Sequence, residues 1–172
     1  MKLTVKEIAI FSMLSALMFS SKVLMEVLPN IHLLGTFIVA FTVVYRQKAL
    51  YPIYGYVLVN GLYEGFNPFG WLPELYLWAI LWGVVMLLPK NMPAKIKPVV
   101  YMTVSGLHGL LFGVFYAPVY AIFAKLSLVE TFSWVVAGLG FDALHGVGNF
   151  ALGILILPIV SVLRGLGQGK AS

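Results

Sequence analysis

Apolar stretches long enough, or nearly long enough, to cross a lipid bilayer follow one another along almost the whole chain. Of the 172 residues, 61% are hydrophobic and only 10% are charged, a composition that excludes a soluble domain of this size. A transmembrane helix needs about 20 apolar residues. Proline, glycine and charged clusters divide the chain into six predicted spans, which are Ile8 to Leu28, Ile31 to Tyr45, Ala49 to Phe66, Trp71 to Leu88, Val99 to Phe123 and Phe132 to Leu163.

These spans predict an all-α integral membrane protein with one transmembrane domain over residues 1–172. The second span is short for a bilayer, and the sixth is long enough to tilt or to extend into the cytoplasm beyond Pro158. The first span lacks a small-residue cleavage site, so we expect it to act as an anchor. The sequence contains no nucleotide-binding loop, so any energy that the protein uses must come from a gradient or from a partner.

Charged residues predict the orientation of the spans, because cytoplasmic loops of membrane proteins are enriched in Lys and Arg. Nine of the eleven basic residues fall at positions that six spans would place on one side: Lys2, Lys6, Arg46, Lys48, Lys90, Lys95, Lys97, Arg164 and Lys170. Five of the six acids fall toward the other side: Glu26, Glu64, Glu74, Glu130 and Asp142. We therefore expect both termini in the cytoplasm. The net charge of +5 indicates topology and attraction to anionic lipid, and no nucleic-acid partner is expected.

Polar residues within apolar spans carry the functional information, because burying them in lipid is costly. Lys22 and Glu26 are four residues apart on one helix face, as a structural ion pair or as part of a binding site. Asn30 and His32 follow Pro29 in an outer turn, where they contact a ligand or meet water. Glu64 ends the third span beside a Gly- and Pro-rich loop that contains Asn67 and permits a tight reversal.

The fourth span carries an aromatic stripe on one face, formed by Trp71, Glu74, Trp78 and Trp82. Such a stripe can stack a planar ring and pair its hydrogen-bond donors. An interfacial aromatic belt explains Trp71 equally well, but Trp78 and Trp82 lie two and three turns deeper.

The sixth span contains the most specific constellation, with Asp142, His145 and Asn149 on one face. An acid and an imidazole one turn apart can bind a metal, relay a proton or orient a ligand through hydrogen bonds. The chain has no Cys and no HExxH pair, which argues against a catalytic metal. His108 in the fifth span joins this face or bonds a neighbouring backbone group.

Two strips of small residues favour close helix contacts. Gly109 and Gly113 form a GxxxG pattern that Ser105 extends, and we expect it to serve internal packing. The first span carries a second strip, formed by Ala9, Ser12, Ala16 and Ser20. If this second strip faces outward, it is a docking surface for another membrane protein; if it faces inward, it is ordinary packing.

Over its whole length the chain resembles the substrate-binding S components of energy-coupling factor (ECF) transporters, the ABC importers that take up vitamins and trace nutrients in prokaryotes. The resemblance rests on size, six spans, cytoplasmic termini and the strip Ser12, Ala16 and Ser20. It implies an S-component-like bundle in a prokaryotic plasma membrane. In the family this strip contacts the transmembrane T component, and here Ser replaces Ala at two of its positions.

The resemblance also implies a mechanism, in which the loaded S component joins a T component and two cytosolic ATPases and then topples to release its cargo. The chain itself would then be no enzyme and need no cofactor, while ATP and Mg would act in the ATPases. The family's substrate site lies near the outer face, so we expect it among Glu26, Asn30, His32, Glu64, Asn67, Trp71, Glu74, Trp78, His108, Asp142, His145 and Asn149.

Acids and stacking aromatics at this site favour a polar, ring-containing, neutral or cationic ligand, such as a vitamin or a modified nucleobase. The candidate cargoes are cobalamin, a queuosine precursor and a thiamine-like compound. Nickel and cobalt members of the family begin with Met-His, and Met1-Lys2 departs from that start, which argues against a metal ion as cargo.

Three other classes of function remain open from the sequence. An integral-membrane enzyme would use Asp142 and His145 as an acid/base pair on a lipid or isoprenoid substrate. An autonomous proton-coupled carrier would titrate Glu26, Glu64 or Asp142 during transport. An accessory or scaffolding subunit would leave the outer polar residues without a role.

Overall fold

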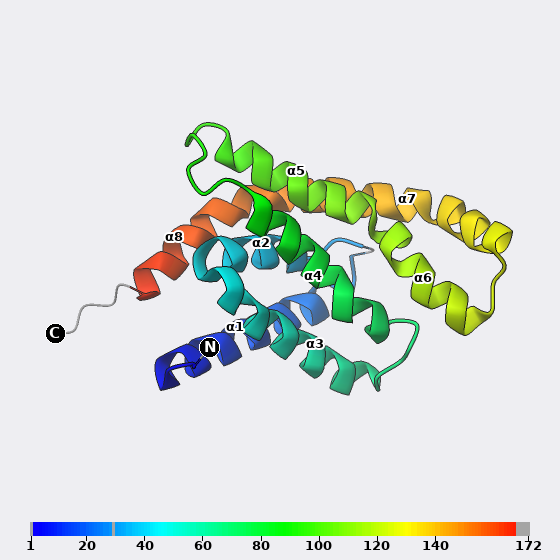
Figure 1. The fold of residues 1–172 in the computed structure, drawn as a ribbon, viewed down its shortest axis with the longest axis horizontal. Coiled ribbons are helices and arrows are strands. Elements are labelled where there is room, and N and C mark those ends of the chain that lie inside the picture. The colour runs from blue at the N-terminus through cyan, green and yellow to red at the C-terminus, as the bar shows by residue number, and fades with distance from the viewer. Residues whose placement is uncertain (1, 29, 168–172) are drawn as a thin grey trace.

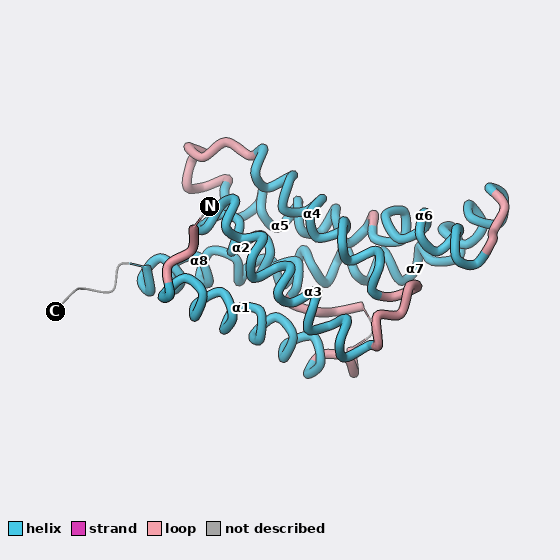
Figure 2. Tube along the Cα trace, turned by 60° about the horizontal axis from the view of Figure 1, so that its bottom comes forward, coloured by secondary structure: helices cyan, strands magenta, loops and turns pink. Residues whose placement is uncertain are grey.

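The computed structural model describes residues 2–28 and 30–167, and the regular structure of this part of the chain is entirely helical (Figure 2). In chain order the helices are α1 (Val5–Leu24), α2 (Leu34–Tyr45), η1 (Arg46–Ala49), α3 (Leu50–Glu64), α4 (Trp71–Leu87), α5 (Lys97–Leu110), α6 (Phe112–Ala124), α7 (Leu128–Leu152), η2 (Gly153–Leu155) and α8 (Ile156–Gly167). The prediction of an all-α protein is confirmed.

The helices run back and forth between two ends of the molecule (Figure 1). α1 leads away from the end where the chain begins, α2 returns to it, and α3 and α4 repeat this path. α5 continues into α6 and α7 continues into α8, so each of these pairs forms one long path. The start of α1 and the end of α8 therefore lie at the same end of the molecule.

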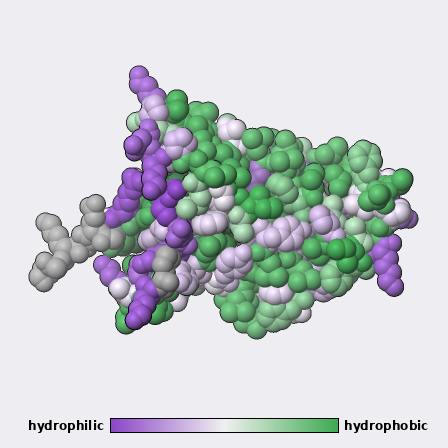
Figure 3. Space-filling model, viewed as in Figure 1, coloured by the Kyte–Doolittle hydropathy of each residue, from purple (hydrophilic) through white to green (hydrophobic). Residues whose placement is uncertain are grey.

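Hydrophilic residues gather at this end in Figure 3, while most of the remaining visible face is hydrophobic. The basic residues that the structure places there come from the start of α1, from η1, from the α4–α5 connection and from α8: Lys2, Lys6, Arg46, Lys48, Lys90, Lys95, Lys97 and Arg164. We call it the basic end. Lys170, which the sequence groups with these residues, lies outside the described part of the chain.

The centre of the molecule is α2, which is buried on every side from Leu34 to Thr42. A helix that is apolar all round must be enclosed by other elements, and α4, α5 and α8 all pack against it. With 12 residues, α2 is about 18 Å long, which is shorter than the bilayer core of about 30 Å. Predicting its start at Ile31 was wrong, because Ile31–Leu33 are not helical.

α5 and α7 pack against each other more extensively than any other pair of helices. Glycines allow this approach: a Cβ on Gly109 would lie 2.9 Å from the carbonyl oxygen of His145, and one on Gly106 would lie 3.2 Å from that of Gly146. The predicted GxxxG face therefore serves internal packing, as expected.

Other predicted boundaries differ from the structure. The first span ends at Leu24 and not at Leu28. The fifth is two helices, α5 and α6, that meet at Leu111, and the sixth contains the 3₁₀ turn η2 between α7 and α8. Close to Leu111 lie the glycines that contact α7, and glycines are frequent at helix kinks.

Within residues 2–28 and 30–167, three helical segments are long and apolar enough to cross a membrane: Val5–Leu24, Lys97–Ala124, which joins α5 and α6, and Leu128–Leu166, which joins α7, η2 and α8. α4, with 17 residues, is a shorter apolar helix. Large apolar side chains are exposed on these segments, for example Leu24 at 78% and Leu128 at 90%. These features are compatible with a location in a membrane.

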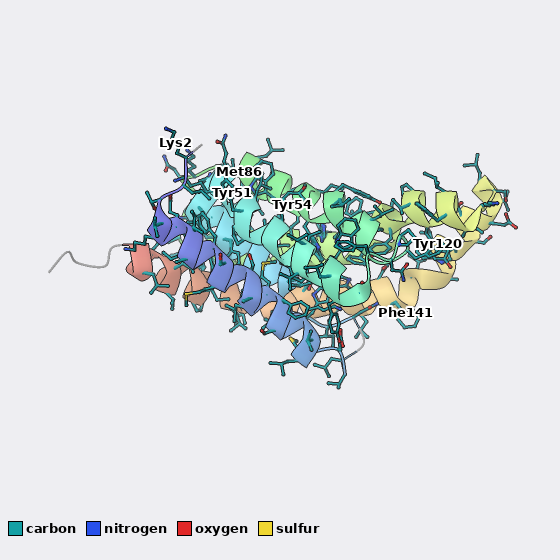
Figure 4. All side chains as sticks on the ribbon, turned by 90° about the horizontal axis from the view of Figure 1, so that it is seen from below. Lys2, Tyr51, Tyr54, Met86, Tyr120 and Phe141 are labelled. Atoms are coloured by element: carbon teal, nitrogen blue, oxygen red, sulfur yellow. The ribbon has the colours of Figure 1, made fainter. Side chains whose placement is uncertain are left out.

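α6 and the first half of α7 extend beyond the other helices as an arm (Figure 1). Figure 4 shows Tyr120 and Phe141 on this arm, far from Lys2 and Met86 near the basic end. Tyr76 and Tyr116 connect α6 to α4 and to the loop before it through hydrogen bonds to backbone carbonyls. Apolar side chains of the arm such as Ile122 and Phe132 are more than two-thirds exposed.

Candidate functional site

A group of polar side chains is enclosed where the segment before α2 meets α4, α5 and α7. We call it the buried polar cluster, and it consists of His32, Thr36, Trp78, Ser105, His108, His145 and Asn149. Apart from His32, which is half-buried, each of these residues is at most 5% exposed. Four of them, His32, Trp78, His108 and His145, are aromatic and provide ring faces as well as polar atoms.

The rings of the cluster contact one another edge to face or at an angle. His145 lies between two rings, with centroid distances of 4.7 Å to His32 and 4.6 Å to Phe112. Trp78 lies 5.8 Å from His108 and 6.2 Å from His32. Offset and tilted arrangements at these distances are favourable for aromatic groups. The rings of the cluster therefore pack against one another and against Phe112.

Most side-chain polar atoms of the cluster have no hydrogen-bond partner among the residues that the structure describes. Both ring nitrogens of His145 and both amide atoms of Asn149 are buried and unpartnered. The same holds for Nε1 of Trp78 and for the hydroxyls of Thr36 and Ser105. A buried polar group without a partner costs about 1–3 kcal/mol, so such groups are rare and typically mark a site for water or a ligand.

His108 differs from the other histidines, because its Nε2 lies 3.0 Å from the carbonyl oxygen of Leu77. Its Nδ1 has no partner. Of the two alternatives for His108, a hydrogen bond to a backbone group of a neighbouring helix is therefore present at one ring nitrogen. The ring also contacts Trp78 of the cluster.

The first turn of α2 closes one side of the cluster. A Cβ on Gly35 would lie 2.9 Å from the Ser105 hydroxyl and 3.3 Å from Nδ2 of Asn149. Glycine at this position lets the first turn of α2 lie close to polar side chains of α5 and α7, and Thr36, the next residue, is also buried. This packing also explains why the unpartnered groups are shielded from solvent.

Asp142 does not pair with His145, although they lie one turn apart on α7. Its carboxylate accepts a hydrogen bond from the N–H of Gly113, at 3.1 and 3.2 Å from its two oxygens. Gly113 is in the first turn of α6, where N–H groups have no partner within the helix. Asp142 therefore caps α6 from a neighbouring helix.

A cleft of about 410 Å³ lies between α6 and α7, and Phe112, Gly113, Tyr116 and Asp142 are among its lining residues. Phe112 also contacts His145. Phe112 therefore borders the cleft and also contacts the buried polar cluster.

The predicted acids of the outer side have partners of their own. Lys22 Nζ lies 2.8 Å from Glu26 and 2.7 Å from Glu64, so one cation joins α1 to the end of α3. Glu74 accepts hydrogen bonds from the Tyr56 hydroxyl and from the amide of Asn60, both at 3.1 Å. These contacts give the three acids a structural role between helices.

The aromatic stripe of α4 does not act as one surface. Trp71 donates its indole N–H to the carbonyl of Val57 in α3, and Trp82 donates to that of Arg46 in η1. Only Trp78 faces the buried polar cluster. The stripe's other indoles hold α4 against its neighbours.

The two predicted loop asparagines also bond locally. Asn30 donates to the carbonyl of Phe141 at 3.3 Å, which ties the α1–α2 segment to α7. Asn67 accepts from the N–H of Phe69 within its own loop. Gly65 begins this loop with a positive φ of 73°, so the tight reversal expected from Gly and Pro is present.

The small-residue strip of α1 faces outward. Ala9, Ser12, Ala16 and Ser20 are all exposed, whereas Phe11, Leu14, Ser15 and Met18 on the other side of α1 are buried. Ser15 donates to carbonyls of Phe11 and Pro52, which fixes α1 on α3. The strip is therefore free to contact another molecule.

Sequence reasoning missed Thr36 and Ser105 as parts of the cluster, and Phe112 as a ring that contacts His145. Thr36 and Ser105 are small polar residues in apolar helices, a signal that is present in the sequence but common in membrane helices. In the described chain no group of three or more His, Asp or Glu side chains is arranged to hold a metal ion.

No protein-family model, no curated protein and no solved structure matches the chain. The geometry of the cluster and the pattern of charges are therefore the basis for assigning a function.

Proposed function

We propose that the chain is the membrane-embedded substrate-binding S component of an ECF-type importer and that the buried polar cluster binds its cargo. In this proposal the chain crosses the membrane six times, both termini are cytoplasmic, and the basic end faces the cytoplasm of a prokaryotic cell. A T component and two cytosolic ATPases supply the remaining machinery, so that ATP and Mg are needed only in those partners.

The observation that carries the proposal is the concentration of unpartnered polar atoms on His145, Asn149 and Trp78. Their burial would destabilise the fold by several kcal/mol if nothing bonded them. A ligand with matching donors and acceptors would remove this cost on binding, which is a source of affinity. Residues kept at the expense of stability are characteristic of functional sites.

The lining of the cluster favours a neutral heteroaromatic cargo over a cationic one. Glu26, Glu64 and Glu74 have partners outside the cluster, and Asp142 caps α6. What remains is imidazole, indole, amide and hydroxyl, which hydrogen-bond and stack but carry no fixed charge. A compact modified nucleobase, such as a queuosine precursor, fits this chemistry better than cationic thiamine or the much larger cobalamin.

The course of the chain supports the proposed topology. Its helical paths alternate in direction, and its basic residues gather at one end, as cytoplasmic loops require. α2 is too short to cross alone, but the non-helical segment before it extends the path. Irregular backbone at membrane depth is tolerated where protein encloses it or where it lines a cavity, and His32 in this segment is part of the cluster.

The outward strip on α1 supports a membrane partner. Exposed small residues let a second helix approach closely, and Ala9, Ser12, Ala16 and Ser20 offer such a surface. The competing enzyme hypothesis loses support, because its acid/base pair is not formed: Asp142 bonds Gly113, and both nitrogens of His145 are unpartnered.

The experiment that tests the proposal is a binding screen with the purified full chain in detergent. Vitamins and nucleobases are added, and tryptophan fluorescence and thermal unfolding are followed, because a ligand of the folded state stabilises it by mass action. One tight binder is expected. Trp78→Phe and His145→Leu should each weaken its binding at least tenfold, whereas Trp82→Phe, one turn along the same face of α4, should not.

A second arm separates binding from assembly. Ala16→Leu should leave binding unchanged and reduce uptake in cells that also produce a T component and ATPases. If no compound binds the folded protein, or if Trp82→Phe weakens binding as much as Trp78→Phe does, the cluster is not a cargo site.

A further inference from the structure

A cavity of about 270 Å³ opens at the basic end, beside the last turn of α2, whereas the buried polar cluster lies beside its first turn. Four cationic side chains from separate parts of the chain line it: Arg46 of η1, Lys90 of the α4–α5 connection, Lys97 of α5 and Arg164 of α8. Residues so far apart in sequence meet here only because the ends of α2, α4, α5 and α8 come together.

These four cations have no acidic partner in the described chain. No acidic residue lines the cavity, and Glu7, the one acid of the six that belongs to the basic end, pairs with Lys48. Arg46 is held in place by a hydrogen bond from Nη2 to the carbonyl of Met86 at 2.9 Å. Like charges brought together without counter-charge repel one another, so an anion in the cavity would be stabilised by all four.

The first turn of α5 also borders the cavity, through the side chain of Lys97, the first residue of this 14-residue helix. Its backbone adds little to an anion site, because the N–H of Lys97 already bonds the carbonyl of Pro93 and Pro98 has no N–H. One turn further along α5, Tyr101 lines the cavity as well; it is 7% exposed, and its hydroxyl has no hydrogen bond within the described residues.

The remainder of the cavity wall is apolar. Its other lining residues include Val43, Val85, Leu88, Leu157 and Val160. A cationic rim above an apolar wall suits a phosphate group that is joined to a hydrocarbon chain. Basic pockets between helices near a membrane surface bind lipid head groups for this reason.

We propose that this cavity binds a phosphate group, with Arg46, Lys90, Lys97 and Arg164 as its ligands. The apolar wall favours an anionic phospholipid as the source over a free phosphate. This inference does not depend on the cargo or on the ECF assignment, because it rests on residues at the other end of the molecule. A lipid held there would fix the ends of α2, α4, α5 and α8 relative to one another.

The test uses the full chain and native mass spectrometry after exchange into detergent containing phosphatidylglycerol or phosphatidylcholine. Retention of one phosphatidylglycerol is expected, with little retention of phosphatidylcholine. The double variant Lys97→Gln/Arg164→Gln should reduce this retention at least tenfold. Its matched control, Lys2→Gln/Lys95→Gln, removes the same charge from exposed positions of the basic end and should retain the lipid like the wild type.

A parallel titration with inorganic phosphate, followed by thermal unfolding, distinguishes the two sources. Stabilisation by lipid alone supports a head-group site, and stabilisation by phosphate that the pocket variant loses supports a soluble phosphate ligand. If the pocket variant and its control lose phosphatidylglycerol retention equally, the retention is due to general surface charge, and the proposal is overturned.

Wild-type protein provides an independent measurement in case the pocket variant does not fold. A phosphatidylglycerol with a photoreactive group near its head should crosslink to cavity residues such as Tyr101 and Leu157. Crosslinks spread over the exposed apolar surface, with none in the cavity, would contradict the inference.

Discussion

The buried polar side chains of this protein are of two kinds. Some form hydrogen bonds to a neighbouring helix, and others have no hydrogen-bond partner among the described residues. Ser15 and Glu74 belong to the first kind, since each bonds groups of a neighbouring helix. His145 and Asn149 belong to the second kind. This difference in hydrogen bonding separates structural residues from candidate binding residues more sharply than their positions in the sequence do.

Asp142 is expected to stabilise the start of α6. Asp142→Ala removes the acceptor for the Gly113 N–H, and loss of a helix cap costs about 0.5–2 kcal/mol. Thermal unfolding in detergent should therefore occur at a lower temperature. Asp142→Asn keeps an acceptor oxygen and should recover most of the loss; equal destabilisation by both substitutions would mean that charge, and not capping, is what matters.

His145 is expected to lower the stability of the protein without ligand. His145→Leu replaces two unpartnered buried nitrogens by a side chain of similar volume, and removing one such burial cost raises the free energy of unfolding by about 1–3 kcal/mol. We expect a higher unfolding temperature without ligand and a loss of ligand-induced stabilisation. A fall in stability would show that His145 is already bonded, for example to an enclosed water.

Glycine residues allow the close contact between α5 and α7. α5 and α7 approach each other through Gly106, Gly109 and Gly146. The same two helices carry His108, His145 and Asn149, so this close contact also shapes the cluster. In α2, Gly35 has the same effect toward Ser105.

Gly109→Ala is expected to destabilise the protein, because the new Cβ would lie 2.9 Å from a backbone oxygen of α7 that has little freedom to move. Overpacking of this kind costs about 1–3 kcal/mol. Gly138→Ala, in α7 but with nothing within 4 Å, should instead stabilise by about 0.5–1 kcal/mol through helix propensity. Denaturation of both variants under the same conditions checks the pair, and matching effects would refute the packing argument.

At the scale of the whole molecule, the distribution of basic residues matches the alternating direction of the helices. All three connections between helical paths at the far end contain few basic residues, while the basic end collects eight of the described cations. In the proposed six-span topology, this asymmetry of charge is the reason for assigning the basic end to the cytoplasm.

The absence of cysteine from the chain makes this topology directly testable. Single cysteines at Gln47 and Lys95 should react with a membrane-impermeant thiol reagent only after the cells are opened. Cysteines at Val27 and Leu128, which are 84% and 90% exposed, should react in intact cells. Labelling of both groups from the same side would contradict the six-span arrangement.

Much of the architecture follows from sequence because it depends on local properties. Apolar length and the breaks at proline and glycine predict the helices and their order, and the placement of Lys and Arg predicts that most basic residues gather at one end of the molecule. Some boundaries moved by several residues, as at Leu24, and the break at Leu111 was not anticipated. Gly109 and Gly113, close to this break, contact α7, and a local sequence pattern does not describe such contacts between helices.

Sequence by itself determined that this chain is helical, apolar and polarised in charge, because composition and periodicity act residue by residue. It also pointed to His32, Trp78, His108, His145 and Asn149. Only the tertiary structure decided which polar residues meet and which are already paired. In the described residues, Glu64 forms an ion pair with Lys22, Asp142 accepts a hydrogen bond from the Gly113 N–H, and the ring nitrogens of His145 have no partner. The physical reason is that hydrogen bonds between helices depend on rotation and separation, which long-range packing sets.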